Sequence, residues 1–184
     1  TSMRLASALA GLDREARRAV EQTFLRAYRD ALASGKARWV ERATATGLIG
    51  ELLTKVGERK RAAYLEARTK LQGRHRKLKP VKGKTLEMPT KAEADAVVDF
   101  MQRFAAKQTD ARFFIPLDIK RRIAGTGSLG LKRYVILVEG RGSPDGNYLV
   151  DLKEATPSAL APRLKLAQPR WQTPAARVTE LQQR

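Results

Sequence analysis

The sequence predicts an α+β fold in which a helical N-terminal segment precedes a small antiparallel β-meander and a helix. Three observations support this fold class. Hydrophobic residues recur every three to four positions through residues 1–71 and again through residues 90–112. After that second helical region the period becomes strand-like, and β-branched and aromatic residues become frequent. Three glycines in a Gly-x-Gly-x-x-Gly pattern (Gly125, Gly127 and Gly130) separate two of these strand-like segments.

The composition excludes several classes of protein. The chain has 184 residues, enough for one domain with a core or for two small ones. It has no cysteine, which excludes disulfides and thiolate metal sites and suits a reducing cytoplasm, and its single histidine speaks against a structural zinc site. No apolar run approaches the ~18 residues of a membrane span. The 37 Lys and Arg against 19 Asp and Glu give a net charge of +18 at pH 7, which indicates either a polyanionic partner or simply a basic surface.

The first well-defined helix is expected to begin after Asp13 and to stop at Ser34-Gly35. Asp13 is a suitable N-cap, because its carboxylate can accept a hydrogen bond from a free backbone N–H in the first turn. Glycine commonly follows a helix because it tolerates the left-handed conformation. Four apolar residues at four-residue spacing, which we interpret as core positions, are Val20, Phe24, Tyr28 and Leu32.

A second helical pattern follows, and a basic segment ends the helical region. Its apolar positions are Leu48, Ile49, Leu52, Leu53 and Val56, continued less clearly by Tyr64, Ala67 and Leu71. We therefore assign residues 1–71 to a helical segment. Residues 72–89 are rich in glycine, proline and basic side chains. They lack the interleaved aromatic residues on which bases would stack, so a solvated linker is preferred over a nucleic-acid patch.

A capping box marks the start of the next helix. Thr90 and Glu93 have the spacing at which each side chain accepts from the other residue's backbone N–H. The apolar residues that follow share one face: Ala94, Val97, Met101, Phe104 and Ala105. We expect residues 90–112 to pack on the lobe formed by residues 113–184.

Three strands and a helix are expected in the last part of the chain. The strands at 118–124, 131–139 and 147–154 should form an antiparallel meander, with the glycines in the first hairpin. A helix should begin at Thr173-Pro174, because proline is well tolerated in the first turn of a helix.

The glycine pattern is a candidate phosphate-binding loop. A dinucleotide fingerprint has to open a helix, and a P-loop needs Gly-Lys-Ser/Thr, whereas here Leu131 and a strand follow the last glycine. The remaining possibility is the protein-kinase arrangement, a glycine-rich hairpin over phosphates with a lysine on the next strand. Glycine allows the backbone N–H groups to approach the phosphates closely. The candidate loop residues are Gly125, Thr126, Gly127, Ser128 and Gly130.

Two further residues complete the candidate nucleotide site. Lys153, at the end of the third strand, could bridge two phosphates as a point charge. Glu180, on the second turn of the last helix, would orient this lysine. The expected cofactor is ATP with Mg²⁺. The simpler alternative is a three-stranded sheet with ordinary glycine turns and a surface lysine.

Three segments resemble a known family: RRIAGTGSLGLKRYVILVEG, YLVDLKEATPSALAP and ARVTELQQR. They are similar to the bacterial family called domain of unknown function 2252, which shows a Gly-x-Gly-Ser-x-Gly segment, a strand ending in Lys-Glu-Ala, and a helix with Arg-Val-Val-x-x-Gln-Arg. The resemblance is specific over residues 117–184. The start of the chain, TSMRLASALA, also resembles the family's Asp-x-x-Arg-Leu-Ala-x-Ser helix.

The resemblance implies a kinase-like fold that is circularly permuted. In the family, a Gly-Asp-x-His-x-x-Asn segment and an Asp-Phe-Asp segment lie upstream and resemble a catalytic loop and a metal-binding motif. Neither occurs in this sequence, so we expect an internal fragment, inactive alone and without metal ligands, whose partner is the remainder of the same polypeptide. Two residues depart from the kinase pattern. Asp151 and Lys132 stand where kinases have apolar residues that line the adenine pocket.

The leading interpretation is therefore a nucleotide-binding phosphotransferase domain with a kinase-like β-lobe. The alternative is a non-enzymatic module that binds a polyanion such as nucleic acid through its basic helices and the segment 73–84. Salt distinguishes the two, because counterion release makes nucleic-acid binding steeply salt-dependent.

Overall fold

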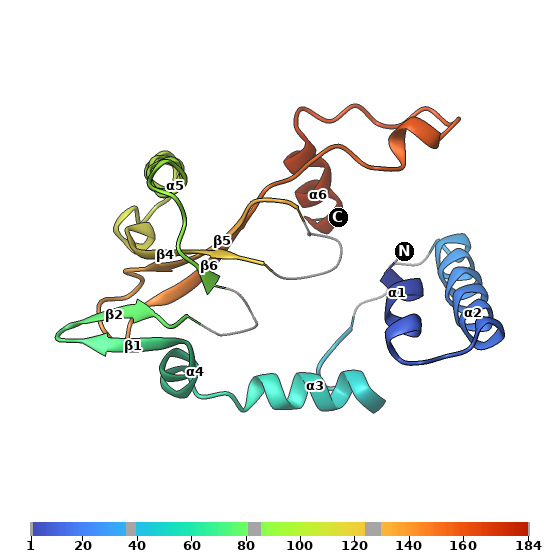
Figure 1. Cartoon of the computed structure of the whole chain (residues 1–184), viewed down its shortest axis with the longest axis horizontal. Helices are drawn as coiled ribbons and strands as arrows, with labels where there is room; N and C mark the ends of the chain where they lie inside the picture. The colour runs from blue at the N-terminus through green and yellow to red at the C-terminus, as the bar shows by residue number, and fades with distance from the viewer. Residues whose placement is uncertain (1, 36–39, 81–85, 124–129, 184) are drawn as a thin grey trace. The chain divides into compact units, whose positions relative to one another are not determined.

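The structure is a computed structural model that describes residues 2–35, 40–80, 86–123 and 130–183. The chain divides into two compact units, Thr1–Lys60 and Arg61–Arg184. The first unit is helical and the second contains all the described strands, so the fold is α+β as predicted (Figure 1).

The described residues of unit 1 form three helices, α1 Ser2–Leu9, α2 Arg14–Ala33 and α3 Gly47–Gly57. The predicted ends of α2 are confirmed. The Asp13 carboxylate accepts a hydrogen bond of 2.8 Å from the Ala16 N–H, and Ser34 is the C-cap. An ion pair of 2.7 Å between Arg4 and Glu21 links α1 to α2.

The hydrophobic stripe of α2 is helical as predicted but is not a core in this structure. Phe24, Tyr28 and Leu32 are each about half or more exposed, at 49%, 57% and 64%. Phe24 stacks on Tyr28 along the same helix, with ring centroids 6.2 Å apart. The apolar face of α3 is exposed as well. The hydrophobic periodicity predicted these helices correctly. Burial also needs an opposing surface, and the periodicity of a single helix does not show whether one is present.

The boundary between the units and the segment after it differ from the sequence prediction. The predicted helical segment reached residue 71. In the structure α3 ends at Gly57, and α4 (Arg61–Arg68) is the first element of unit 2. A two-stranded antiparallel sheet crosses the predicted boundary: β1 Thr69–Gln72 lies almost entirely in the predicted helical segment, and β2 His75–Leu78 lies in the expected linker. Gly73 adopts a positive φ of 61° in the tight turn between them. The basic residues of this segment obscured its alternation of buried and exposed positions.

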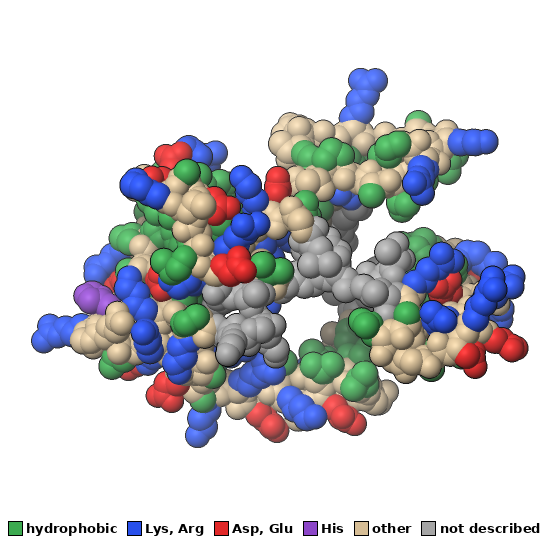
Figure 2. Space-filling view, in the orientation of Figure 1, with side chains coloured by type: hydrophobic (Ala, Val, Ile, Leu, Met, Phe, Trp, Pro, Cys, Tyr) green, Lys and Arg blue, Asp and Glu red, His purple; other side chains and the backbone are tan. Residues whose placement is uncertain are grey.

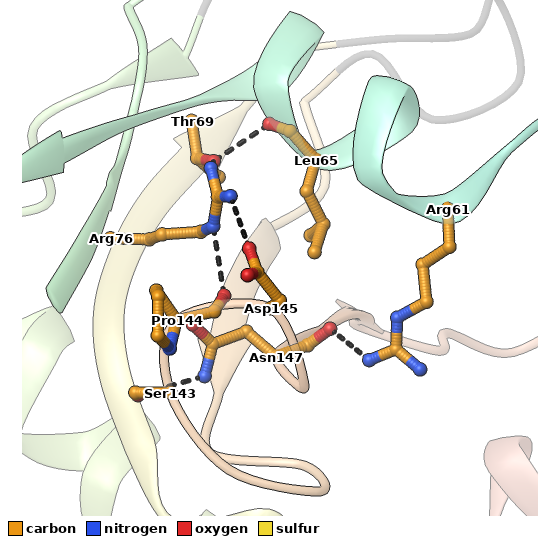
Figure 3. A network of polar contacts seen from close by, with 8 residues as sticks. All are labelled: Arg61, Leu65, Thr69, Arg76, Ser143, Pro144, Asp145 and Asn147. Carbon is orange, nitrogen blue, oxygen red and sulfur yellow. Dashed lines mark hydrogen bonds and ion pairs between the residues drawn. The ribbon is translucent and has the colours of Figure 1, made fainter. Parts of the chain in front are cut away.

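The β1–β2 hairpin is anchored by a buried arginine (Figure 3). The guanidinium of Arg76 donates to the carbonyl of Pro144 at 2.8 Å, to the carboxylate of Asp145 at 2.8 Å and to the hydroxyl of Thr69 at 3.2 Å. Arg61 from α4 donates to the backbone carbonyl of Asn147 at 2.6 Å. Two arginines therefore fix the turn between the last two strands against α4 and the hairpin.

Unit 2 also contains a four-stranded antiparallel sheet in the order β3-β4-β5-β6. Strands β4, β5 and β6 confirm the predicted meander, and each of their ends lies within three residues of its predicted position. The strands of this sheet are β3 Leu86–Glu87, β4 Pro116–Arg122, β5 Arg133–Val138 and β6 Tyr148–Lys153. The other described helices of unit 2 are α5 Lys91–Ala105, α6 Pro174–Gln183, and the short 3₁₀ helices Arg112–Phe114 and Ala161–Arg163.

The core of unit 2 lies on both faces of this sheet. On one face, Val97 and Met101 of α5 pack against Tyr134, Ile136 and Val138. On the other face, Leu78 of the β1–β2 hairpin packs against Val135 and Leu137. Figure 1 shows α5 and the hairpin on opposite sides of the strands. The helix therefore packs on the lobe as predicted, and β5 is the central, fully covered strand.

In the part of the chain that the structure describes, no helix is both long enough and apolar enough to cross a membrane.

Candidate functional site

The glycine-rich segment connects two adjacent antiparallel strands. β4 ends at Arg122 and β5 begins at Arg133, and the described residues from Gly130 onward lead into this strand and not into a helix. Gly125, Thr126, Gly127 and Ser128 lie outside the described residues. Gly130 is described and has a φ of 84°, a backbone conformation that favours glycine. A Cβ at this position would meet no atom within 4 Å, so the backbone conformation favours glycine here and close packing does not require it.

Lys153 lies beside the C-terminal end of this connection. It is the last residue of β6 and is paired with Arg133, the first residue of β5. The next residues continue the pairing: the Glu154 N–H donates to the Lys132 carbonyl at 2.8 Å, and the Glu154 carboxylate accepts from the Lys132 N–H at 2.9 Å. The structure thus brings the predicted lysine next to the strand that leaves the glycine loop.

Asp151 is held by two arginines on the face of the sheet that Lys153 shares. The Nε of Arg133 donates to Asp151 at 2.9 Å, and its Nη2 donates to the other carboxylate oxygen. Arg122 lies 3.7 Å from the same carboxylate. The hydrogen bond to Asp151 raises the pKa of Arg133 further above its usual range. Three strands that surround the glycine connection are therefore joined by one carboxylate.

This cluster was not foreseen as a unit. The sequence showed Asp151 only as a departure from the kinase pattern. The signal that could have revealed its partners is register: residues 133 and 153 are paired across the strands, and residues two apart on a strand face the same side, so a carboxylate at 151 faces the arginine at 133.

Glu180 lies on α6 as predicted, but it is exposed. The described ion pairs do not include one between Lys153 and Glu180. Lys153 instead lines a cavity of about 520 Å³, and residues of α6 form another part of its wall. The polar side chains that line this cavity are those of Lys153, Glu154, Thr156, Ser158, Arg177 and Thr179.

A second cavity, of about 430 Å³, lies between the start of α5 and the ends of β5 and β6. At its wall the Tyr134 hydroxyl donates to the Glu93 carboxylate at 3.1 Å. The hydrogen bond from the Thr90 backbone N–H lowers the pKa of Glu93, with smaller help from Tyr134. Burial raises the pKa of Tyr134, and the hydrogen bond to Glu93 adds to this effect. The capping box of α5 is confirmed and at the same time connects the helix to the sheet.

The charged donors of this site suit phosphate better than a metal ion. Lys153 and the arginines beside it offer charged N–H groups, which bind phosphate oxygens. Among the residues with described positions, no group of three or more acidic or histidine side chains could hold a metal ion. The described residues therefore do not fit Mg²⁺, and no step is assigned to it.

Comparisons with known proteins identify a family but no characterised relative. No curated protein matches the chain. No solved structure matches it either. A family described as uncharacterized proteins conserved in bacteria (DUF2252) matches residues 1–184. The match spans every residue, so the chain belongs to the DUF2252 family of uncharacterized bacterial proteins.

Proposed function

We propose that unit 2 is a kinase-like nucleotide-binding domain and part of a phosphotransferase. One observation carries the proposal: a glycine-rich connection joins two adjacent strands, and a lysine on the third strand is paired with the first residue after that connection. Protein kinases use this arrangement to hold the phosphates of ATP. The ligand we propose is ATP, and the location we propose is the cytoplasm, where ATP is available.

Each group has a defined task in this proposal. The loop residues 125–130 donate backbone N–H groups to phosphate oxygens. Lys153 adds a mobile ammonium beside them. Arg122 and Arg133 already neutralise Asp151, so with Lys153 the cluster around Asp151 has three cations against one carboxylate. A phosphate therefore meets a net positive surface although Asp151 lies close by. The orienting role of Glu180 remains a prediction.

The transfer step needs groups that the described residues do not provide. Phosphoryl transfer depends on metal ions, on carboxylates that hold them and on a residue that orients the nucleophile. We propose that these carboxylates belong to the remainder of a longer polypeptide, as the family resemblance implies. The 184-residue chain should consequently bind ATP weakly and hydrolyse none.

The experiment measures ATP affinity and ATP turnover for the 184-residue chain and for a version extended upstream. We expect Lys153→Met to weaken ATP binding by about tenfold, because it removes a charge-assisted hydrogen bond. The matched control is Lys165→Met, an exposed lysine outside both cavities, which should bind as the parent does. Turnover by the short chain that Lys153→Met abolishes would show that its catalytic acids lie within these residues. If neither version binds ATP, the proposed function is wrong.

A second candidate function, binding of a nucleic acid, is favoured by the β1–β2 hairpin. Lys70 and Lys77 are directly opposite each other in its register, and Arg74 at its turn is exposed. The Lys77 ammonium donates to the Leu117 carbonyl at 3.2 Å, whereas the exposed Lys70 and Arg74 can each meet a phosphate of a nucleic-acid backbone. Figure 2 shows lysine and arginine side chains spread over this part of unit 2. Binding of an oligonucleotide that weakens steeply with salt, and that Lys70→Gln with Arg74→Gln reduces, would support this function over the first.

A further inference from the structure

We propose that Arg177 is a second phosphate-binding residue, which acts together with Lys153 on the terminal phosphate of the nucleotide. This inference rests on the proposed function and names a residue that the kinase comparison does not suggest. Its basis is the cavity of about 520 Å³ between the end of β6 and the first turns of α6, which both cations line.

The cavity has the chemistry of an anion site. It brings an ammonium from β6 and a guanidinium from α6 together with three hydroxyl groups, those of Thr156, Ser158 and Thr179. Its single acidic side chain is Glu154, whose carboxylate accepts the Lys132 N–H at 2.9 Å. Two cations against one engaged carboxylate leave a net positive cavity whose hydroxyls can donate to further phosphate oxygens.

Arg177 is positioned to act in this cavity. It is half-buried, and its Nη2 donates to the Thr156 carbonyl at 3.4 Å, which orients the side chain toward the segment that follows β6. That contact uses one of the five N–H donors of a guanidinium. A planar guanidinium can give two parallel hydrogen bonds to one phosphate, while the lysine contributes a compact charge.

The same helix offers an acid that does not take part. Glu180 is three residues after Arg177 on α6, but it is exposed and does not line the cavity. The face that α6 turns toward Lys153 is therefore cationic. A cationic face suits an anionic ligand between strand and helix, whereas a direct lysine–glutamate pair would bring Glu180 to that face.

The test compares three probes on the 184-residue chain: ATP, inorganic tripolyphosphate and adenosine. We expect Arg177→Gln to weaken both ATP and tripolyphosphate by about tenfold or more, and to leave adenosine unchanged, because only the phosphates meet the guanidinium. Arg177→Lys keeps the charge without the bidentate geometry and should lose less. Arg170→Gln, an exposed arginine outside the cavity, is the matched control. Circular dichroism verifies that α6 forms in each variant.

The outcomes separate this inference from the proposed function. Unchanged affinity of Arg177→Gln for both phosphate probes overturns the inference while ATP binding by the parent chain sustains the function. A parent chain that binds tripolyphosphate through Arg177 but does not bind ATP sustains Arg177 as a phosphate-binding residue, and overturns both the nucleotide as its ligand and the proposed function. A loss of ATP affinity in Glu180→Gln with none in Arg177→Gln overturns the inference in favour of a lysine–glutamate pair. A parent chain that binds neither ATP nor tripolyphosphate overturns both.

Discussion

Helices α2 and α5 carry the same local signals but have opposite environments. Both begin at a side-chain N-cap, Asp13 for α2 and Thr90 for α5, and both have one hydrophobic face. Helix α5 buries Val97, Met101 and Ala105 against the sheet of unit 2. Helix α2, although longer, buries none of its residues. Capping and periodicity thus decide that a helix forms, whereas burial depends on a partner surface that the helix sequence does not contain.

The largest expected effect is a difference in the free energy of unfolding that is lost when a core side chain of unit 2 or an exposed apolar side chain of α2 in unit 1 is removed. Ile136 is completely buried on the face of the sheet that α5 covers. Ile136→Ala should therefore lower the free energy of unfolding by about 3 kcal/mol, because it loses buried apolar surface and leaves a cavity. Phe24→Ala should cost less than about 0.5 kcal/mol, since it loses only a contact with Tyr28 along the helix. Urea unfolding followed by far-UV circular dichroism measures both. Equal losses would mean that the α2 stripe is buried by a partner in solution.

The next effect concerns the network of polar contacts around the buried Arg76 of unit 2. Arg76→Ala removes two hydrogen bonds that connect the β1–β2 hairpin to the turn between β5 and β6, and a third that joins β2 to Thr69 of β1. We expect a loss of about 2 kcal/mol, less than for a fully buried ion pair because Asp145 is exposed. The comparison is with Arg74→Ala in the same hairpin, whose exposed side chain should contribute almost nothing. If both variants unfold at the same urea concentration, the arginine network contributes no stability.

A smaller effect should separate the two N-caps. Thr90→Ala should lower the stability of unit 2 by about 1 kcal/mol, because α5 is part of its core. Asp13→Ala removes a cap of the same kind from α2, so it should reduce helical circular dichroism while the unfolding transition of unit 2 stays unchanged. A shift of that transition by Asp13→Ala would show that the units unfold together.

Local chemistry accounts for what the sequence predicted, and tertiary contacts account for what it missed. The cap at Asp13, the capping box at Thr90 and the meander after residue 112 follow from short-range patterns, and all three are confirmed. The β1–β2 hairpin escaped because its inward side chain is Arg76, which reads as a surface residue until its distant partners in the 143–147 turn are known. Among the site residues, Lys153 could be placed on its strand by sequence. Arg177 could not be foreseen, because a shared cavity depends on how α6 packs.

The smallest expected effect is a pH dependence on the α5 side of the comparison. The pKa of Glu93 is lowered mainly by the Thr90 backbone N–H, so its ionised form stabilises the folded state above the usual glutamate pKa of about 4.3. That contribution should vanish as the pH falls through the lower pKa of the folded state. The pKa of Tyr134 is raised mainly by burial, so its neutral form stabilises the folded state below about pH 10, and this contribution is lost as the pH rises further.

The urea midpoint of unit 2, measured from pH 3 to 11 for the parent chain, Glu93→Gln and Tyr134→Phe, tests both contributions. The difference between the parent and Glu93→Gln should shrink mainly on the acid side, and that between the parent and Tyr134→Phe should change mainly on the alkaline side. Because the two side chains share a hydrogen bond, each difference should also change, by less, at the other end of the pH range. Other carboxylates titrate equally in all three proteins and cancel in these differences. Asp13 provides the contrast in unit 1, where Asp13→Asn should leave the midpoint of unit 2 unchanged at every pH. Differences that stay constant across the pH range would mean that the hydrogen bond between Glu93 and Tyr134 does not connect α5 to the sheet in solution.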